Sequence, residues 1–123
     1  MSAVFVNEKN IEWLESMPGV SGKLLGLDKE SKAHAYLVKY APGTEFPRHS
    51  HPSLEHIYVL EGEVEGEGQV YGPGTHMIFP AGSEHGPFYN KGPVTELVFF
   101  SGLSGLEEMS PAIKALFEEQ GAL

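Results

Sequence analysis

The sequence contains no cysteine, and this absence removes several classes of small protein at once. Without cysteine there is no disulfide framework, no thiolate nucleophile and no cysteine-based zinc site. Basic residues are also few, since eight Lys and Arg stand against 17 Asp and Glu and give a formal net charge of −9. Because phosphate binding depends largely on Lys and Arg, this charge argues against nucleic acid and against an anionic membrane as partners.

Long hydrophobic runs are missing as well. No stretch of about 18 apolar residues predicts a membrane span, and the N-terminus lacks the basic and apolar regions of a signal peptide. We therefore expect a cytoplasmic location. The 123 residues fit one domain, and a hydrophobic content of 41% suffices for its core, which excludes the disordered class.

Fifteen Gly and nine Pro interrupt the chain every few residues, which favours short strands over a helical bundle. Apolar and alternating runs predict strands over 33–40, 55–61, 75–79 and 94–100. Such closely spaced strands are typical of a β-sandwich or β-barrel. One helix is expected near the C-terminus, where Ser110 is an N-cap, Pro111 is the first helical residue and an apolar stripe ends before Gly121.

Four glutamates at alternating positions, Glu61, Glu63, Glu65 and Glu67, are expected on one face of an extended run. A row of carboxylates of this kind usually lies in solvent, where it discourages edge-to-edge strand pairing. We therefore interpret this row as a solvated face and not as a cation site.

Three of the six histidines form a pattern with one glutamate. In an extended segment residues i and i+2 point to the same side, so His49 and His51 can present two imidazoles to one point. Glu55 opens the next predicted strand, and the turn at 80–82 can bring His85 alongside. Imidazole nitrogens with one carboxylate suit divalent Zn, Fe, Mn, Ni or Cu, and they do not suit Ca²⁺.

These residues stand in two longer motifs that resemble those of the cupin superfamily. Residues 43–62, GTEFPRHSHPSLEHIYVLEG, fill each fixed position of the first cupin motif, Gly-x5-His-x-His-x3-Glu-x6-Gly. Residues 74–90, GTHMIFPAGSEHGPFYN, are similar to the second motif, Gly-x5-Pro-x-Gly-x2-His-x3-Asn. The final Asn position holds Tyr89, and Asn90 follows one residue late.

The resemblance implies a single cupin domain over residues 1–123, an all-β double-stranded β-helix, or jelly-roll barrel, with a short C-terminal helix. It also implies one divalent transition-metal ion held by His49, His51, Glu55 and His85. We expect Fe²⁺ or Zn²⁺, with Mn²⁺ and Ni²⁺ as further candidates. Short segments such as those at 18–20, 42–44 and 80–83 are more narrowly similar to the ChrR-type anti-sigma cupin domains and to small diketone and hydroxyacetophenone dioxygenases.

An open coordination position separates a catalytic metal site from a closed structural one. With Fe²⁺, the resemblance implies a dioxygenase acting on a small diketone or hydroxyketone, and no Ser, Cys or Lys nucleophile is visible in either motif. The alternative is a non-catalytic zinc-binding sensor or a small-ligand-binding cupin. No catalytic residue beyond the ligands is assigned at this stage.

Aromatic residues flank both motifs, and core packing competes with pocket lining as their role. The candidate pocket residues are Phe46, Phe79, Phe88, Tyr89 and Phe99. The only arginine, Arg48, is expected to face outward and pair with a glutamate, with substrate binding as the less favoured role. His34 and His76 are expected to be ordinary packing or surface residues, and His56 must point away from the metal because it directly follows Glu55.

The strand predicted at 55–61 has apolar residues on both faces. Ile57 and Val59 form the inward set, whereas Tyr58 and Leu60 would be polar on a strand with one face in solvent. The N-terminal arm or the C-terminal helix are two candidates to cover this outer face. We favour the third, a homodimer formed by sheet packing.

Overall fold

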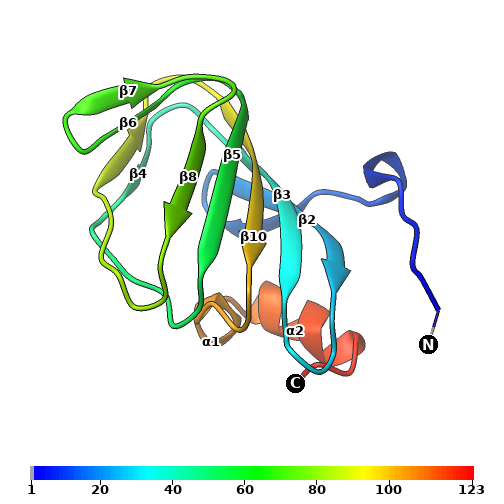
Figure 1. The fold of residues 1–123 in the computed structure, drawn as a ribbon. Helices are drawn as coiled ribbons and strands as arrows, with labels where there is room; N and C mark the ends of the chain where they lie inside the picture. Colours follow the sequence, from blue (N-terminus) through cyan, green and yellow to red (C-terminus); the bar gives the residue numbers. More distant parts are fainter. Residues whose placement is uncertain (1) are drawn as a thin grey trace.

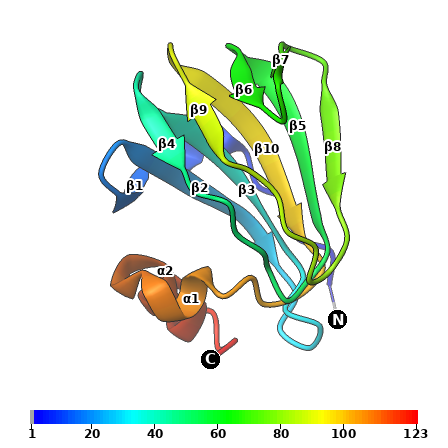
Figure 2. The same cartoon turned by 90° about the vertical axis from the view of Figure 1, so that its left-hand side faces the viewer.

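The computed structural model describes residues 2–123 and confirms an all-β barrel with a short helix near the C-terminus. One sheet has six strands, and its spatial order is β1 (Leu14–Met17), β2 (Val20–Leu27), β3 (His34–Tyr40), β10 (Val94–Phe100), β5 (Glu55–Glu61) and β8 (His76–Phe79). The other sheet has the order β4 (Thr44–Phe46), β9 (Phe88–Asn90), β6 (Val64–Gly66) and β7 (Gln69–Tyr71). All named strand pairs are antiparallel. Figure 1 shows the strand arrangement, and Figure 2 shows the sheets as two layers.

Strand β10 is central because it pairs with β3 on one side and with β5 on the other. Its side chains alternate: Val94, Glu96, Val98 and Phe100 are buried, whereas the residues between them are not. This alternation is the period of two expected of a strand with one face toward the interior. One of the inward side chains is therefore a glutamate.

Two short helices close one end of the two sheets (Figure 2), α1 (Leu106–Met109) and α2 (Pro111–Glu119). The predicted cap is present: the Ser110 hydroxyl accepts a hydrogen bond from the Ile113 N–H at 3.4 Å, and Pro111 begins α2. Ile113 and Phe117 of α2 pack in one buried cluster with Tyr36, Val98, Phe100 and Ala122. The C-terminal helix thus covers the interior end of the barrel and not the outer face of β5.

A second buried cluster lies farther along the sheets and contains Val59, Val64 and Val94. A sharp turn at Gly62 connects Val59 to Val64. Its φ is +83°, and a Cβ added to it would lie 2.1 Å from the Pro93 carbonyl oxygen. Only glycine fits there. This turn ends β5 at Glu61, so the four alternating glutamates do not share one strand, although all four are exposed as expected.

The first residues extend away from the body of the domain (Figure 1). Within the described range, a single 3₁₀ turn at Glu8–Asn10 precedes β1, and Phe5 is 91% exposed. None of the helices described in residues 2–123 has the length and apolar content needed to span a bilayer.

Candidate metal centre

Two connections bring three histidines together. His49 and His51 lie on the connection from β4 to β5, and His85 lies on the connection from β8 to β9. The backbones of His49 and His85 are paired, since each N–H donates to the other's carbonyl oxygen at 2.9 Å. Gly82 in the predicted turn donates its N–H to the His51 carbonyl oxygen at 2.8 Å. Main-chain hydrogen bonds therefore hold all three histidines in one place.

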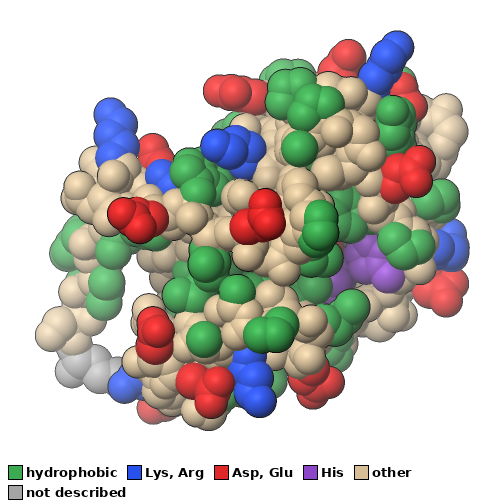
Figure 3. Space-filling view, turned by 180° about the vertical axis from the view of Figure 1, so that it is seen from behind, with side chains coloured by type: hydrophobic (Ala, Val, Ile, Leu, Met, Phe, Trp, Pro, Cys, Tyr) green, Lys and Arg blue, Asp and Glu red, His purple; other side chains and the backbone are tan. Residues whose placement is uncertain are grey.

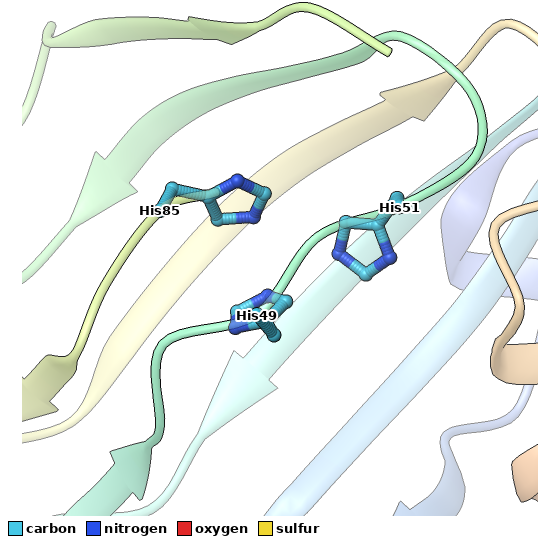
Figure 4. Close-up of side chains that lie close together, drawn as sticks. All are labelled: His49, His51 and His85. Carbon is cyan, nitrogen blue, oxygen red and sulfur yellow. The ribbon is translucent and has the colours of Figure 1, made fainter. Parts of the chain in front are cut away.

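The ligand nitrogens of His49, His51 and His85 all lie within 4.8 Å of one another, and Figure 4 shows the three rings close together. Glu55, the first residue of β5, joins this group. Its Oε1 atom lies 3.5 Å from His51 Nε2 and 3.4 Å from His85 Nε2. Two ligand atoms that share one ion at about 2.1 Å are themselves roughly 3.0–3.4 Å apart. The three-histidine group could bind a metal ion, and Glu55 lies within reach of the same centre.

Backbone carbonyls set the tautomers of two of these rings. His49 Nδ1 lies 2.7 Å from the Pro47 carbonyl oxygen, and His51 Nδ1 lies 2.9 Å from the Ser104 carbonyl oxygen. Since a carbonyl oxygen only accepts, Nδ1 carries the proton in both rings and Nε2 is left with a free lone pair. Burial lowers the pKa of His49, which further favours the neutral form that binds metals.

Several polar atoms at this centre are buried without a hydrogen-bond partner within the described structure. They are Glu55 Oε1 and both ring nitrogens of His85. The ring of His85 stacks on Phe79 with centroids 4.0 Å apart and an interplanar angle of 19°. Leaving a buried polar atom unpaired costs about 1–3 kcal/mol. Three imidazoles and one carboxylate are the donors that divalent transition metals prefer, so a bound ion fits Glu55 Oε1 and one of the two His85 nitrogens.

The carbonyl that orients His51 belongs to a loop fixed by Glu107 of α1. The buried Glu107 carboxylate accepts hydrogen bonds from the Ser104 N–H, the Ser104 hydroxyl and the Gly105 N–H at 2.9–3.2 Å. His34 Nε2 lies 3.8 Å from the same carboxylate. Sequence reasoning did not identify this support because Glu107 lies far along the chain from both motifs. Its only sequence signal is its position in the short acidic turn before the predicted helix.

The candidate metal ligands lie in the wall of an interior cavity of about 360 Å³. Both sheets and both helices contribute to the lining, which is predominantly apolar. Its largest side chains include Tyr36, Tyr40, Phe46, Met77, Phe88, Phe100 and Met109. Figure 3 shows histidine side chains, in purple, among hydrophobic ones on one face of the molecule. A mainly apolar cavity with a few converging polar groups is typical of a small-molecule site.

Glu96 is a second carboxyl-bearing residue of this cavity and was not identified from the sequence. Its side chain is buried, and burial raises its pKa to about 7, while interaction with the Tyr40 hydroxyl lowers that pKa by less. The sequence did hold a signal. In the predicted strand 94–100, Glu96 has the parity of Val94 and Val98, which places it on the interior face.

The candidate pocket residues divide into three groups. Phe46 and Phe88 line the cavity, and Phe79 lies against His85. Tyr89 and Phe99 are not among the lining residues of this cavity. Each of them alternates with inward neighbours along its strand, so its side chain belongs to the opposite face. Asn90, one residue after the motif position, lines the cavity instead of Tyr89 and donates to the Thr44 hydroxyl at 3.1 Å.

The remaining histidines and Arg48 lie outside the candidate centre. His34 is buried between Tyr36, Phe100 and Phe117 as a packing residue. His56 and His76 pair on the exposed side of the sheet, with Nδ1 of the former 2.9 Å from Nε2 of the latter. Arg48 forms an exposed ion pair with Glu84 at 3.0 Å, as its expected outward direction requires.

Comparison with known proteins shows the family and the fold of the chain. A family model described as the ChrR cupin-like domain matches residues 1–103. The dimethylsulfoniopropionate lyase DddQ of Ruegeria pomeroyi is 36% identical over 73 residues, a match that covers 55% of this chain and 36% of the lyase. The chain thus spans about a third of the length of that curated relative.

Two solved structures show the same fold at low sequence identity. A putative acetylacetone dioxygenase from Methylibium petroleiphilum superposes with a TM-score of 0.71 at 15% identity, over 83% of this chain and 78% of that one. The complex of SigE with the anti-sigma ChrR from Rhodobacter sphaeroides contains a chain that matches with a TM-score of 0.62 at 24% identity. That match covers 76% of this chain and 51% of the other.

Proposed function

Because the chain belongs to the family of ChrR cupin-like domains, we propose that His49, His51, Glu55 and His85 together hold one divalent transition-metal ion, Fe²⁺ or Zn²⁺ before Mn²⁺ or Ni²⁺. The buried, unpartnered atoms of Glu55 and His85 support this ligand set. When bound, the ion supplies Lewis acidity toward ketone oxygens and, as Fe²⁺, reactivity toward O₂.

The proposed activity is that of a small metal-dependent dioxygenase whose substrate is a diketone or hydroxyketone. The observation that carries it is the position of the ligand set in the wall of an apolar cavity of about 360 Å³, a volume in the range of small-molecule sites. A purely structural metal site has a closed shell and needs no such space beside it. The fold likeness to a putative acetylacetone dioxygenase supports the substrate class.

The residues of the chain have separate tasks in this proposal. The carbonyls of Pro47 and Ser104 hold His49 and His51 with Nε2 toward the centre. Tyr36, Phe46 and Phe88 provide apolar walls that exclude water and contact the carbon skeleton of a ligand. No Lys or Arg is among the cavity-lining residues in the described part of the chain, so a ketone suits the cavity better than a carboxylate.

The second candidate function is a non-catalytic zinc-binding sensor, which the family description and the likeness to ChrR favour. In that case the four side chains close the coordination shell of Zn²⁺ and the ion stabilises the domain without turnover.

Elemental analysis of protein purified without a tag, combined with oxygen uptake on acetylacetone and 2-hydroxyacetophenone, distinguishes the two candidates. Stoichiometric iron with substrate-dependent uptake supports the dioxygenase. Tight zinc without turnover supports the sensor. Dimethylsulfoniopropionate belongs in the same panel, and its consumption without oxygen would contradict the dioxygenase in favour of a lyase. His49→Ala is expected to lose most of the ion, whereas the matched His76→Ala, outside the centre, keeps it.

We also propose that a second copy of the chain covers the outer face of β8, β5 and β10. Five large apolar side chains on these strands are 37–53% exposed: Tyr58, Leu60, Ile78, Leu97 and Phe99. These side chains surround the paired His56 and His76, and the face carries no Asp, Glu, Lys or Arg among these seven residues, so a two-fold copy meets it without burying like charges of those residues. Light scattering at micromolar concentration should give the dimer mass and Leu97→Asp the monomer mass. A monomeric wild type contradicts the dimer.

A further inference from the structure

The cavity contains a second carboxyl group that the candidate metal centre does not use. Glu96 lies on β10, in register between Val38 of β3 and Val59 of β5. It lines the same cavity as His49, His51, Glu55 and His85, and it is only 4% exposed. No salt bridge found in residues 2–123 includes Glu96, and no cationic side chain is among the lining residues.

A glutamate at this position is costly for a purely structural role. Its strand neighbours at the same level are two valines, and burying a carboxyl without a cationic partner opposes folding. An apolar residue of similar size would pack there at lower cost. Buried carboxyls that face a cavity and lack a charge partner are more typical of functional sites than of packing.

The groups that act on Glu96 keep its proton exchangeable near neutral pH. Burial has the largest effect and raises its pKa to about 7, and the negative charge of Glu55 on β5 raises it further. The hydroxyl of Tyr40 on β3 acts in the opposite direction by hydrogen bonding to the carboxyl. Burial also raises the pKa of Tyr40 well above its ordinary value, so Tyr40 remains a neutral donor. A base with a pKa close to the working pH is best placed for proton transfer.

We propose that Glu96 is the catalytic base of the cavity and accepts the acidic C–H proton of a diketone or hydroxyketone bound there. The inference rests on the proposed function for its substrate class. In this step the substrate C–H bond breaks, its electron pair stays on the substrate as the enolate, and the proton forms an O–H bond with the Glu96 carboxylate. Tyr40 is a positioning residue, since it contacts the carboxyl and not the reacting carbon.

The same arrangement selects the charge of the ligand. Two carboxyl groups, Glu55 and Glu96, line one cavity that has no Lys or Arg, so a negatively charged group placed beside Glu96 meets repulsion that a neutral one does not. The expected substrate is therefore neutral when it binds and becomes anionic only after Glu96 has taken its proton.

The test measures proton removal separately from oxygen chemistry. Zn²⁺-loaded protein without oxygen is mixed with 2-hydroxyacetophenone in D₂O, and exchange of the methylene protons is followed by NMR from pH 5 to 9. Wild type should accelerate exchange, and the rate should rise with pH to a plateau as the Glu96 carboxyl loses its proton. Glu96→Gln should lower the rate 10²–10⁴-fold, as for loss of a general base, with unchanged zinc content. The exposed Glu45→Gln should match wild type, and Tyr40→Phe should raise the midpoint of this rise with pH.

A second measurement does not depend on the metal or on turnover. In metal-free protein with ¹³C-labelled glutamate, one carboxyl signal should titrate near pH 7 and be absent from Glu96→Gln. The proposal that Glu96 is the catalytic base would be overturned by either of two results. One is proton exchange in Glu96→Gln at the wild-type rate and with the wild-type pH profile. The other is no accelerated exchange in wild type at any pH. If exchange depends on Glu96 but iron-loaded protein takes up no oxygen with any substrate, the result supports Glu96 as the base and contradicts the dioxygenase activity.

Discussion

Glu107 should be a residue outside the candidate metal centre whose loss affects both folding and metal binding. Its carboxylate accepts hydrogen bonds from two backbone N–H groups and one hydroxyl of Ser104 and Gly105, all buried or nearly so. Glu107→Ala leaves these donors unpaired. A hydrogen bond to a charged group contributes about 1.5–3 kcal/mol and several around one carboxylate are not additive, so we expect a loss of about 3–5 kcal/mol.

Glu107→Gln retains one oxygen acceptor and should lose roughly 1–2 kcal/mol, since the remaining hydrogen bonds are no longer charge-assisted. For a chain of 123 residues, 1 kcal/mol corresponds to a shift in Tm of about 4 °C. The expected decreases in Tm are therefore roughly 12–20 °C for Glu107→Ala and about 4–8 °C for Glu107→Gln. The adjacent Glu108→Gln is the matched control, because Glu108 is exposed.

The effect should extend to the metal, because the Ser104 carbonyl that accepts from His51 belongs to the same loop. Loss of a group that orients a metal ligand typically reduces affinity about 10–100-fold. Zinc titration against a competing chelator measures this at a temperature where the variant is folded. If Glu107→Gln melts within 1 °C of Glu108→Gln and binds zinc equally well, the loop does not orient His51 and the reasoning is refuted.

Four further predictions concern folding. Ser110→Ala should lower stability by about 1 kcal/mol in a urea titration, because the N-cap of α2 is lost. Phe117→Ala should cost about 3–5 kcal/mol in the same assay, because Phe117 is fully buried, whereas the exposed Met109→Ala should stay within about 0.5 kcal/mol. Arg48→Ala should change stability by less than about 1 kcal/mol, since its pair with Glu84 is solvent-exposed, and a larger loss would contradict a purely surface role. In metal-free protein, the free energy of unfolding of wild type relative to Glu96→Gln should fall by about 3 kcal/mol between pH 4.5 and 7 and then level off. The reason is that the pKa of Glu96 in the folded protein lies above its ordinary value, so ionisation of the carboxyl opposes folding. A difference that stays constant across that range would contradict the burial of the Glu96 charge.

Much of the fold followed from local patterns in the sequence. The run 94–100 was bounded correctly because its β-branched and aromatic residues leave no competing structure, and Ser110 with Pro111 marked the start of α2. The prediction that the four alternating glutamates share one extended run was wrong, because alternation alone does not reveal that the chain turns at Gly62. A period of two describes a strand only where the backbone stays extended.

The candidate metal centre was accessible from sequence because its members stand in two motifs with fixed spacing. Glu96 and Glu107 were not, since each acts through contacts with residues distant in sequence. The final position of the second motif was also hard to predict. The motif spacing points to Tyr89, whereas the side chain of β9 that lines the cavity is that of the next residue, Asn90. The spacing of a motif in the sequence indicates which residues can meet. Whether a single carboxylate is buried depends on the side chains that pack around it in the folded protein.

The paired backbones of His49 and His85 have a consequence for how the protein is assembled in a cell. In small zinc-dependent modules the unliganded polypeptide is a random coil, and cation supply governs whether any native protein exists. In this chain main-chain hydrogen bonds between two distant connections place His49 and His85 side by side without using their rings, so we expect the donor arrangement to persist when no ion is bound. On that expectation the chain folds before it binds metal, and the identity of a bound ion is then determined by availability as well as by affinity.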